Sequence, residues 1–287
     1  MKKIDFKATT NSFAAVLYIL NKSFIKTPKG FLFTYILPII FLVMFKFIFN
    51  SIVFVPGNDE INLLIKQVNL LSYTLLPLTT MLILLSSSIV EWKNSVFLKR
   101  IENSGISKIA FILSLWFFYF IISLSGLVLL FLISLPLGGQ EYLSSFKSMG
   151  WGYIIFGIIL ISLVSIALST FIGGITSNDG LVQGLVVGVF FISVFMAGIL
   201  LSPAMIIKSD VTRYITYFIP FKHPVYVFLY GAYGNAPMDS FEAIYNHSNY
   251  TRGYDYTAVW QPILISLILI FALLGLSTKT FRWAAKK

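Results

Sequence analysis

Charged side chains are scarce in this chain of 287 residues, because Asp, Glu, Lys and Arg make up only 11% of it. Ordinary soluble domains contain about 25% charged residues, and here hydrophobic residues reach 57%. Cysteine is absent, which excludes disulfide bonds, thiolate metal sites and cysteine nucleophiles. This composition is typical of a polytopic membrane protein.

Motifs for catalysis and nucleotide binding are also missing. There is no G-x-x-x-x-G-K-[ST] loop, whose backbone amides and lysine would hold a nucleotide. The two histidines, His223 and His247, are isolated from other residues at metal-ligand spacing. Acidic residues are nearly absent from the apolar stretches, so no catalytic carboxylate pair is indicated. We predict no catalytic residue, metal site or cofactor in this chain.

Long uncharged runs are what the chain does contain, for example residues 67–90 and 109–140. Each can cross a hydrocarbon core of roughly 30 Å, which takes about 20 helical residues. The runs are too long, and too uniformly apolar, for the roughly 10-residue strands of a membrane barrel. We predict an all-α membrane protein in which residues 1–287 form a single transmembrane domain. Its six spans are expected at about 30–54, 68–90, 109–137, 150–174, 181–205 and 257–278.

The residues before the first span predict an amphipathic helix on the membrane surface. Within residues 5–27, Phe13, Val16, Leu17 and Leu20 recur at helical spacing among Lys and Asn. A signal peptide is the alternative, because the chain begins with MKK and an apolar stretch follows. The polar insert and the lack of a small-residue cleavage site disfavour it.

Two further connections are predicted between spans, a short loop at 138–148 and a long segment at 206–256. The first half of the long segment, TRYITYFIPFKHPVYVFLYG, is apolar enough to form short re-entrant helices. Its second half is rich in Gly, Asn and Asp and predicts a surface loop. Glycosylation sequons occur there at Asn246 and Asn249. We interpret them as chance, because the Lys-, Ile- and Asn-rich composition is typical of AT-rich bacterial genomes.

The basic residues are unequally distributed between the two sides of the predicted membrane. If the N-terminus is cytoplasmic, fourteen of the 21 Lys and Arg and four of the 11 Asp and Glu lie inside. This positive-inside pattern makes the net charge of +10 a topology signal and not a nucleic-acid site. We predict a multi-pass protein of the bacterial plasma membrane with both termini cytoplasmic. Lys46 falls inside the first span, where it either has a function or extends its stem to the outer interface.

A charged island at residues 91–108 (EWKNSVFLKRIENSGISK) separates the second and third spans. It holds six charges in eighteen residues. Gly105 predicts the end of a helix, and Ser107 predicts a cap for the third span. The residues alone fit both an ordinary cytoplasmic loop and a docking point for a soluble partner.

Glycines at four-residue spacing begin the fifth span: Gly180, Gly184 and Gly188. Two successive G-x-x-x-G steps allow another helix to approach closely. That helix could belong to the same chain or to a second subunit, and the spacing fits either alternative.

The island resembles the stretch between the second and third spans of ABC-2 type permeases, the membrane subunits of bacterial ABC exporters of the drug or antimicrobial type. The matching residues are Glu91, Lys93, Leu98, Lys99, Arg100 and the turn at 103–107. AGILLSPAM and the later IPFKHPVY are similar to the family's G-x-x-x-P and N-P-L-x-Y segments. Gly105 stands where proline is usual, and His223 where asparagine is usual.

The resemblance implies a coupling helix in the island that docks on a cytoplasmic ATPase. Two ATPases, which hold ATP and magnesium, would pair with two permease chains, identical or homologous, in the membrane lipid. The coupling residues would be Glu91, Trp92, Lys93, Phe97, Lys99, Arg100 and Glu102. The second and fifth spans would line the substrate path, with the candidates Tyr73, Thr79, Thr80, Gln183, Phe190, Phe191 and Phe195.

We therefore expect ATP-driven export by alternating access, without ATP hydrolysis in this chain. Because the spans are aromatic and uncharged, the expected cargo is hydrophobic or amphipathic, such as a drug, an antimicrobial peptide or a lipid-like molecule. A self-contained ion-coupled carrier or channel is the alternative. It would need acidic residues or broken helices near the membrane midplane, where the sequence offers only Lys46.

Overall fold

The computed structural model describes residues 6–49, 59–201, 210–234, 256 and 258–283, and all regular elements in these residues are helices. Six stretches are long and apolar enough to span a membrane: Pro28–Ile48, Asn62–Asn94, Lys108–Gln140, Trp151–Ile175, Asp179–Met196 and Trp260–Thr280. The predicted all-α fold with six spans is confirmed. The helices are α1 (Phe6–Lys26), α2 (Pro28–Phe31), the π-helix η1 (Leu32–Ile36), α3 (Leu37–Phe49), α4 (Asp59–Tyr73), α5 (Leu76–Asn94), α6 (Phe97–Asn103), α7 (Lys108–Ser145), α8 (Trp151–Ile175), α9 (Asp179–Met196), α11 (Asp210–Thr216), α12 (Lys222–Ala232) and α14 (Trp260–Thr280).

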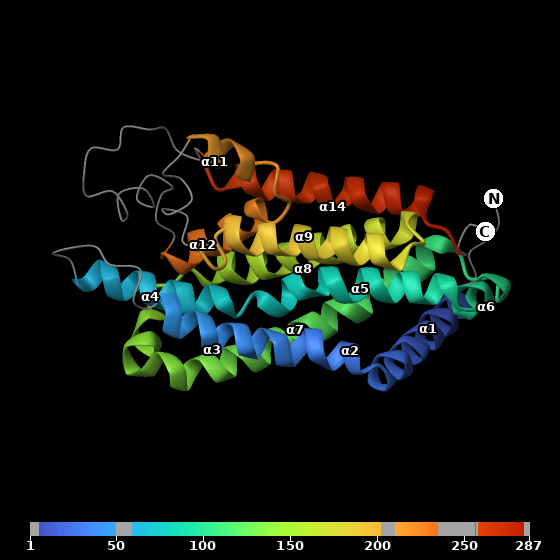
Figure 1. Cartoon of the computed structure of the whole chain (residues 1–287), viewed down its shortest axis with the longest axis horizontal. Coiled ribbons are helices and arrows are strands. Elements are labelled where there is room, and N and C mark those ends of the chain that lie inside the picture. The colour runs from blue at the N-terminus through green and yellow to red at the C-terminus, as the bar shows by residue number, and fades with distance from the viewer. Residues whose placement is uncertain (1–5, 50–58, 202–209, 235–255, 257, 284–287) are drawn as a thin grey trace.

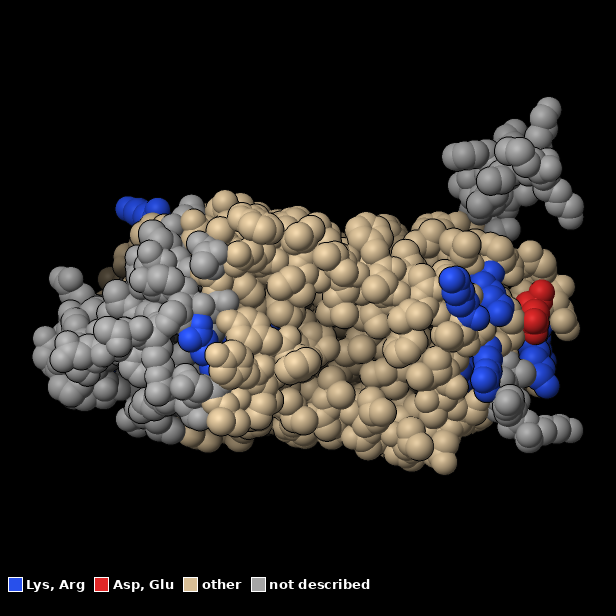
Figure 2. Space-filling view, turned by 90° about the horizontal axis from the view of Figure 1, so that it is seen from above, with Lys and Arg blue, Asp and Glu red and all other residues tan. Residues whose placement is uncertain are grey.

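The spans lie side by side in an elongated bundle (Figure 1). Helices α1 and α6 lie at one end, which we call the α6 end, and α4, α11 and α12 lie at the other, the α12 end. On the face shown in Figure 2, the described charged residues lie near these two ends, and the surface between them is uncharged. Large apolar side chains are exposed on the spans, among them Phe47, Phe117 and Ile268. An uncharged belt with exposed apolar side chains is the surface that a lipid bilayer covers.

The second span, formed by α4 and α5, is the centre of the bundle. Its most apolar stretch is 94% buried, against 22% for the first, third and sixth spans, so the other spans surround it. Helix α5 packs against α7, α8 and α9. Short turn hydrogen bonds at Thr74 and Leu75 separate α4 from α5, just before Pro77.

Three spans are irregular or closely packed at one level of the bundle. The first span contains the π-helix η1, and the second breaks before Pro77. A Cβ atom built on Gly126 of α7 would lie 2.8 Å both from the carbonyl oxygen of Thr34 in η1 and from the Cβ of Pro77. A glycine is therefore required where these three elements meet.

Two predicted boundaries are wrong because glycines set the chain direction there. The fifth span was expected to reach residue 205, but α9 ends at Met196 and Gly198 turns the chain with φ +96°. The predicted short loop at 138–148 is largely helical, because α7 continues to Ser145 through a kink at Gly139 with φ +70°. Residues 50–54 of the first span, residues 202–205 of the predicted fifth span, and residues 235–255 with the two sequons lie outside the described residues.

Helix α12 occupies the first half of the long segment between the fifth and sixth spans. It is buried against α8 and α14. A Cβ atom on Gly157 would lie 2.6 Å from the backbone nitrogen of Phe228, and the Gly150 N–H donates to the Gly231 carbonyl at 2.8 Å. The predicted short helices therefore form, and their depth in the membrane stays a prediction.

Helix α1 forms where the amphipathic helix was predicted. Val16, Leu20 and Phe24 are buried, and α1 packs against α7. Tyr18, in contrast, is 67% exposed. The burial pattern matches the spacing in the sequence, while a position on the membrane surface stays a prediction.

Candidate functional site

The charged island folds as the end of α5, a short break and helix α6. The break falls at Ser95, whose backbone is extended. Gly105 follows α6 with φ +78°, and the Oγ of Ser107 accepts a hydrogen bond from the Ala110 N–H at 3.2 Å. The predicted helix stop and helix cap are both confirmed.

Lys93 joins the island to the fourth span within the chain. Its side chain is buried. The ammonium donates to the carbonyl oxygens of Gly173 at 2.7 Å, Gly174, and Thr176 at 3.1 Å. These carbonyls lie at the C-terminal end of α8, where main-chain acceptors lack helical partners and a positive charge is favoured. Lys93 therefore caps α8, and its predicted coupling role stays a prediction.

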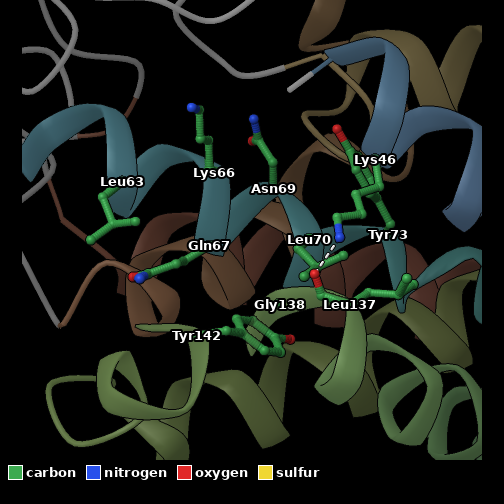
Figure 3. A pocket seen from close by; sticks show the side chains of 10 residues that line it. All are labelled: Lys46, Leu63, Lys66, Gln67, Asn69, Leu70, Tyr73, Leu137, Gly138 and Tyr142. Carbon is green, nitrogen blue, oxygen red and sulfur yellow. Dashed lines mark hydrogen bonds between the residues drawn. The ribbon is translucent and has the colours of Figure 1, made fainter. Parts of the chain in front are cut away.

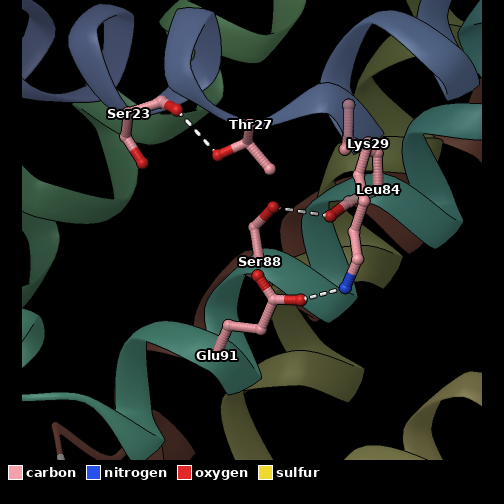
Figure 4. Close-up of polar contacts among 6 residues, drawn as sticks. All are labelled: Ser23, Thr27, Lys29, Leu84, Ser88 and Glu91. Atoms are coloured by element: carbon pink, nitrogen blue, oxygen red, sulfur yellow. Dashed lines mark hydrogen bonds and ion pairs between the residues drawn. The ribbon is translucent and has the colours of Figure 1, made fainter.

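Glu91 joins the island to the first span. Its Oε1 accepts a hydrogen bond from the ammonium of Lys29 in α2, and the two groups form an ion pair (Figure 4). The side chain of Glu91 is 37% exposed and that of Lys29 is 52% exposed. Solvent therefore screens the ion pair, and its contribution to stability is small. Its structural consequence is a link between the start of the first span and the end of the second.

The exposed charges of the island are those of α6. Trp92 and Phe97 pack against each other, with ring centroids 5.2 Å apart. Lys99, Arg100 and Glu102 are exposed, and their side chains form no ion pair or hydrogen bond with the described residues. The seven predicted coupling residues therefore divide into an internal group and an exposed group on α6.

A groove of about 530 Å³ runs between α1 and α6. Helix α1 contributes Ala15, Val16 and Ile19 to its wall. Facing them are Phe97, Arg100, Ile101 and Ser104 of α6, together with Ile106. Its walls are mostly apolar, and Arg100 supplies a positive charge. This is a surface on which a helix or loop of a soluble protein can pack.

An aromatic row connects three of the spans. The ring centroid of Phe45 in α3 lies 6.2 Å from that of Tyr73 in α4 and 6.3 Å from that of Phe195 in α9. Phe195 stacks on Phe191, which contacts Phe190. Four of the predicted path residues therefore lie in one row, and Phe45 completes it. No sequence pattern singled out Phe45, because 28 phenylalanines make aromatic residues common in this chain.

The other predicted path residues lie elsewhere. Thr79 and Thr80 are buried in α5, where their hydroxyls donate to the carbonyl oxygens of Leu76 and Pro77. Gln183 lines a cavity of about 180 Å³ next to the Lys29–Glu91 ion pair. The structure does not bring these three residues to the aromatic row, and their role in transport stays a prediction.

The glycine stripe of the fifth span is uncovered in a single chain. Gly180, Gly184 and Gly188 are exposed. A Cβ atom on Gly184 or Gly188 would meet no described atom within 4 Å, and one on Gly180 would meet only the Asn178 side chain, at 3.6 Å. Packing inside the chain thus has no contact to support it among the described residues.

His223 is held in a cluster of aromatic residues near the α12 end. Its Nε2 lies 3.1 Å from the carbonyl oxygen of Tyr217, so this nitrogen is the donor, and Nδ1 accepts from the Tyr256 hydroxyl at 2.7 Å. Burial is the main cause that lowers the pKa of His223 to about 4; the hydrogen bond to the Tyr217 carbonyl raises the pKa, and the nearby charge of Lys222 lowers it. Within the described residues, no group of three or more His, Asp or Glu could hold a metal ion.

The six spans and the uncharged belt define the class as a multi-pass α-helical membrane protein. The family model described as ABC-2 family transporter protein matches residues 65–279, and the chain belongs to this family of membrane permeases. The match runs from within the second span to the sixth span and includes the whole island. No curated protein matches the sequence.

Proposed function

We propose that this chain is the permease subunit of an ATP-driven exporter, and that α6 is the helix on which a separate ATPase subunit docks. The observation that supports this most strongly is the structure of the island. A short helix with exposed charges projects at the α6 end, beside a mostly apolar groove formed with α1. ABC-2 permeases usually work with ATPase subunits, which would hold the ATP and magnesium.

The contacts of the island provide a physical route from α6 to the spans. Force on α6 reaches α5 through the short break at Ser95. The ion pair of Glu91 with Lys29 connects α5 to the first span. The hydrogen bonds of Lys93 with the carbonyls at the end of α8 connect α5 to the fourth span. Docking at one helix is thereby linked to three spans, as alternating access requires.

In this proposal the α6 end is cytoplasmic and the membrane is the bacterial plasma membrane. The positive-inside pattern supports this orientation, because exposed Lys99 and Arg100 lie at this end. Helix α1 lies at the same end, and α14 ends there at Thr280 (Figure 1). Both termini are then cytoplasmic.

A second permease chain would cover the glycine stripe on α9, and the substrate path would lie between the two chains. The aromatic row reaches the exposed side chain of Phe191 on α9. A path lined with aromatic rings favours a hydrophobic or amphipathic cargo, which includes drugs, antimicrobial peptides and lipid-like molecules.

The test of docking is co-purification with an ATP-binding subunit encoded beside the permease, using Arg100→Glu against Lys147→Glu. The side chains of Arg100 and Lys147 are both exposed, and Lys147 lies in the turn after α7, away from α6. We expect Arg100→Glu to reduce complex formation and transport at least about tenfold, since a charge at a docking surface is reversed. Lys147→Glu should leave both unchanged. Equal complex formation by the two variants would contradict the docking role of α6.

A further inference from the structure

A polar cavity of about 300 Å³ lies near the α12 end, between α3, α4 and α7 (Figure 3). Helix α4 supplies six of its ten lining residues, α7 supplies three and α3 supplies Lys46. The cavity is separate from the groove beside α6, and it takes no part in the docking proposed above.

The lining residues carry positive charge and hydrogen-bond donors, and none of them is acidic. Lysine ammonium groups donate three hydrogen bonds each, amide nitrogens two and phenolic hydroxyls one. The donors belong to Lys46, Lys66, Gln67, Asn69, Tyr73 and Tyr142. Such a set fits an anion with several oxygen acceptors, such as a phosphate group.

The charge of Lys46 is only partly compensated. Its ammonium donates to the carbonyl oxygen of Leu137 and lies 5.4 Å from the centroid of the Phe47 ring. No ion pair involves Lys46 within the described residues. A lysine within a span usually pairs with an acidic group or reaches water, so the structure leaves room for an anion beside this ammonium.

The cavity forms at the kink in α7. Gly139 leaves the helical conformation with φ +70°, and the carbonyl of Leu137, two residues before it, accepts a hydrogen bond from Lys46. A Cβ atom on Gly138 would overlap the ring of Tyr142, at 2.4 Å, so this ring lies directly against the glycine. Tyr142 is fully buried and its hydroxyl is 3.2 Å from that of Ser134. The floor of the cavity is therefore closely packed.

The position of the cavity indicates an amphipathic ligand. Lys66 and Leu63 are exposed, so the cavity opens to the surface at the edge of the uncharged belt. Along α3, the side chains of Ile40, Met44 and Phe47 are exposed and form an apolar track on the helix that carries Lys46. An anionic head in the cavity would place a hydrocarbon tail along this track.

We propose that the cavity binds the phosphate headgroup of an anionic membrane amphiphile from the leaflet at the α12 end. Lys46 and Lys66 supply the positive charge that attracts the phosphate group, and Asn69 donates an additional hydrogen bond. The same chemistry is offered by free phosphate, and the experiment separates the two sources.

The test measures binding to the purified chain in detergent by native mass spectrometry and by the shift of its thermal unfolding midpoint. The probes are phosphatidylglycerol, phosphatidylcholine with the same acyl chains, and inorganic phosphate. The variants are a double variant that carries both Lys46→Gln and Lys66→Gln, the single variant Lys66→Gln, and Lys147→Gln as the matched control.

We expect the wild-type chain and Lys147→Gln to bind phosphatidylglycerol in preference to phosphatidylcholine. The double variant should bind it at least about tenfold more weakly, because charge-assisted hydrogen bonds are lost. Lys66→Gln alone should show an intermediate loss, and its exposed position keeps the test valid if the double variant fails to fold. Unchanged phosphatidylglycerol binding in these variants overturns the proposal, and so does an equal response to inorganic phosphate.

Discussion

Lysine residues occupy three distinct environments in this protein, and each environment defines a different role. Lys93 is buried against helix-terminal carbonyls, Lys46 lies within a span beside a cavity, and Lys99 is exposed on α6. Their side chains are chemically identical, so the same coupling role was predicted for Lys93 and Lys99. The structure distinguishes them because only Lys93 contacts the carbonyls at the end of the fourth span.

Replacing Lys93 should reduce the stability of the fold. In Lys93→Met, the apolar stem is retained, but the carbonyls of Gly173 and Thr176 lose their charged donor. Removing the buried charge offsets part of this loss, and we expect a net destabilisation of about 1–3 kcal/mol. Thermal unfolding followed by tryptophan fluorescence measures it, with the exposed Lys99→Met as control. If Lys93→Met unfolds at the wild-type temperature, the capping role is wrong.

The His223 cluster should make stability depend on pH. The pKa of the buried imidazole is about 4, below the value of about 6.5 in an unfolded chain. The contribution of His223 to the free energy of unfolding is therefore fully present above pH 6.5. This contribution decreases as the pH falls towards 4, because the unfolded state binds the proton more readily. We expect a loss of about 2 kcal/mol at pH 5 relative to pH 7.5.

The matched variant for this prediction is His223→Asn, which removes the titrating group. Asparagine keeps a donor and an acceptor for the neighbouring groups. Its unfolding midpoint should change less between pH 7.5 and pH 5 than that of the wild type. An identical pH dependence in both proteins would show that another group is responsible.

At the scale of elements, the packing of α12 on α8 depends on glycine. A Cβ atom at Gly157 would lie within 2.7 Å of the backbone of Phe228, whereas one at Gly152 on the same helix would meet no described atom within 4 Å. Gly157→Ala should therefore destabilise the protein by about 1–3 kcal/mol. Gly152→Ala should be neutral or slightly stabilising, because alanine favours the helix. Unfolding midpoints of the two variants provide the comparison, and equal midpoints would contradict this packing.

The spans were predictable from the sequence because burial in a bilayer demands about 20 apolar residues without charge. Gly105 and Ser107 were also predictable, since helix stops and caps depend on local conformation. The Lys29–Glu91 pair and the Phe45 contacts were not, because their partners are far apart in the chain. The ends of α9 and α7 were missed, since Gly198 and Gly139 are two of 19 glycines and nothing local distinguishes them.

At the scale of the whole molecule, the central position of the second span explains how the proposed parts can act together. Helix α5 contacts α7, α8 and α9 and continues towards α6. Its other end leads through α4 to the cavity that contains Lys46. A displacement of this one span would alter both ends of the bundle, whereas the most apolar stretches of the first, third and sixth spans are only 22% buried.

The proposed second permease chain can be tested on the glycine stripe of α9. The chain has no cysteine, so Gly184→Cys introduces a single thiol at a position with no described neighbour within 4 Å. Two such helices packed through their glycines would bring the cysteines within the Cα separation of about 4.4–6.8 Å that a disulfide requires. Gly275→Cys is the matched control, because this glycine of α14 is equally exposed and unobstructed. Oxidation in native membranes should therefore produce a covalent dimer of Gly184→Cys, visible by electrophoresis without reductant, and none of Gly275→Cys. Equal crosslinking at both positions, or crosslinking at Gly275 alone, would contradict a pair of identical chains that meet along α9.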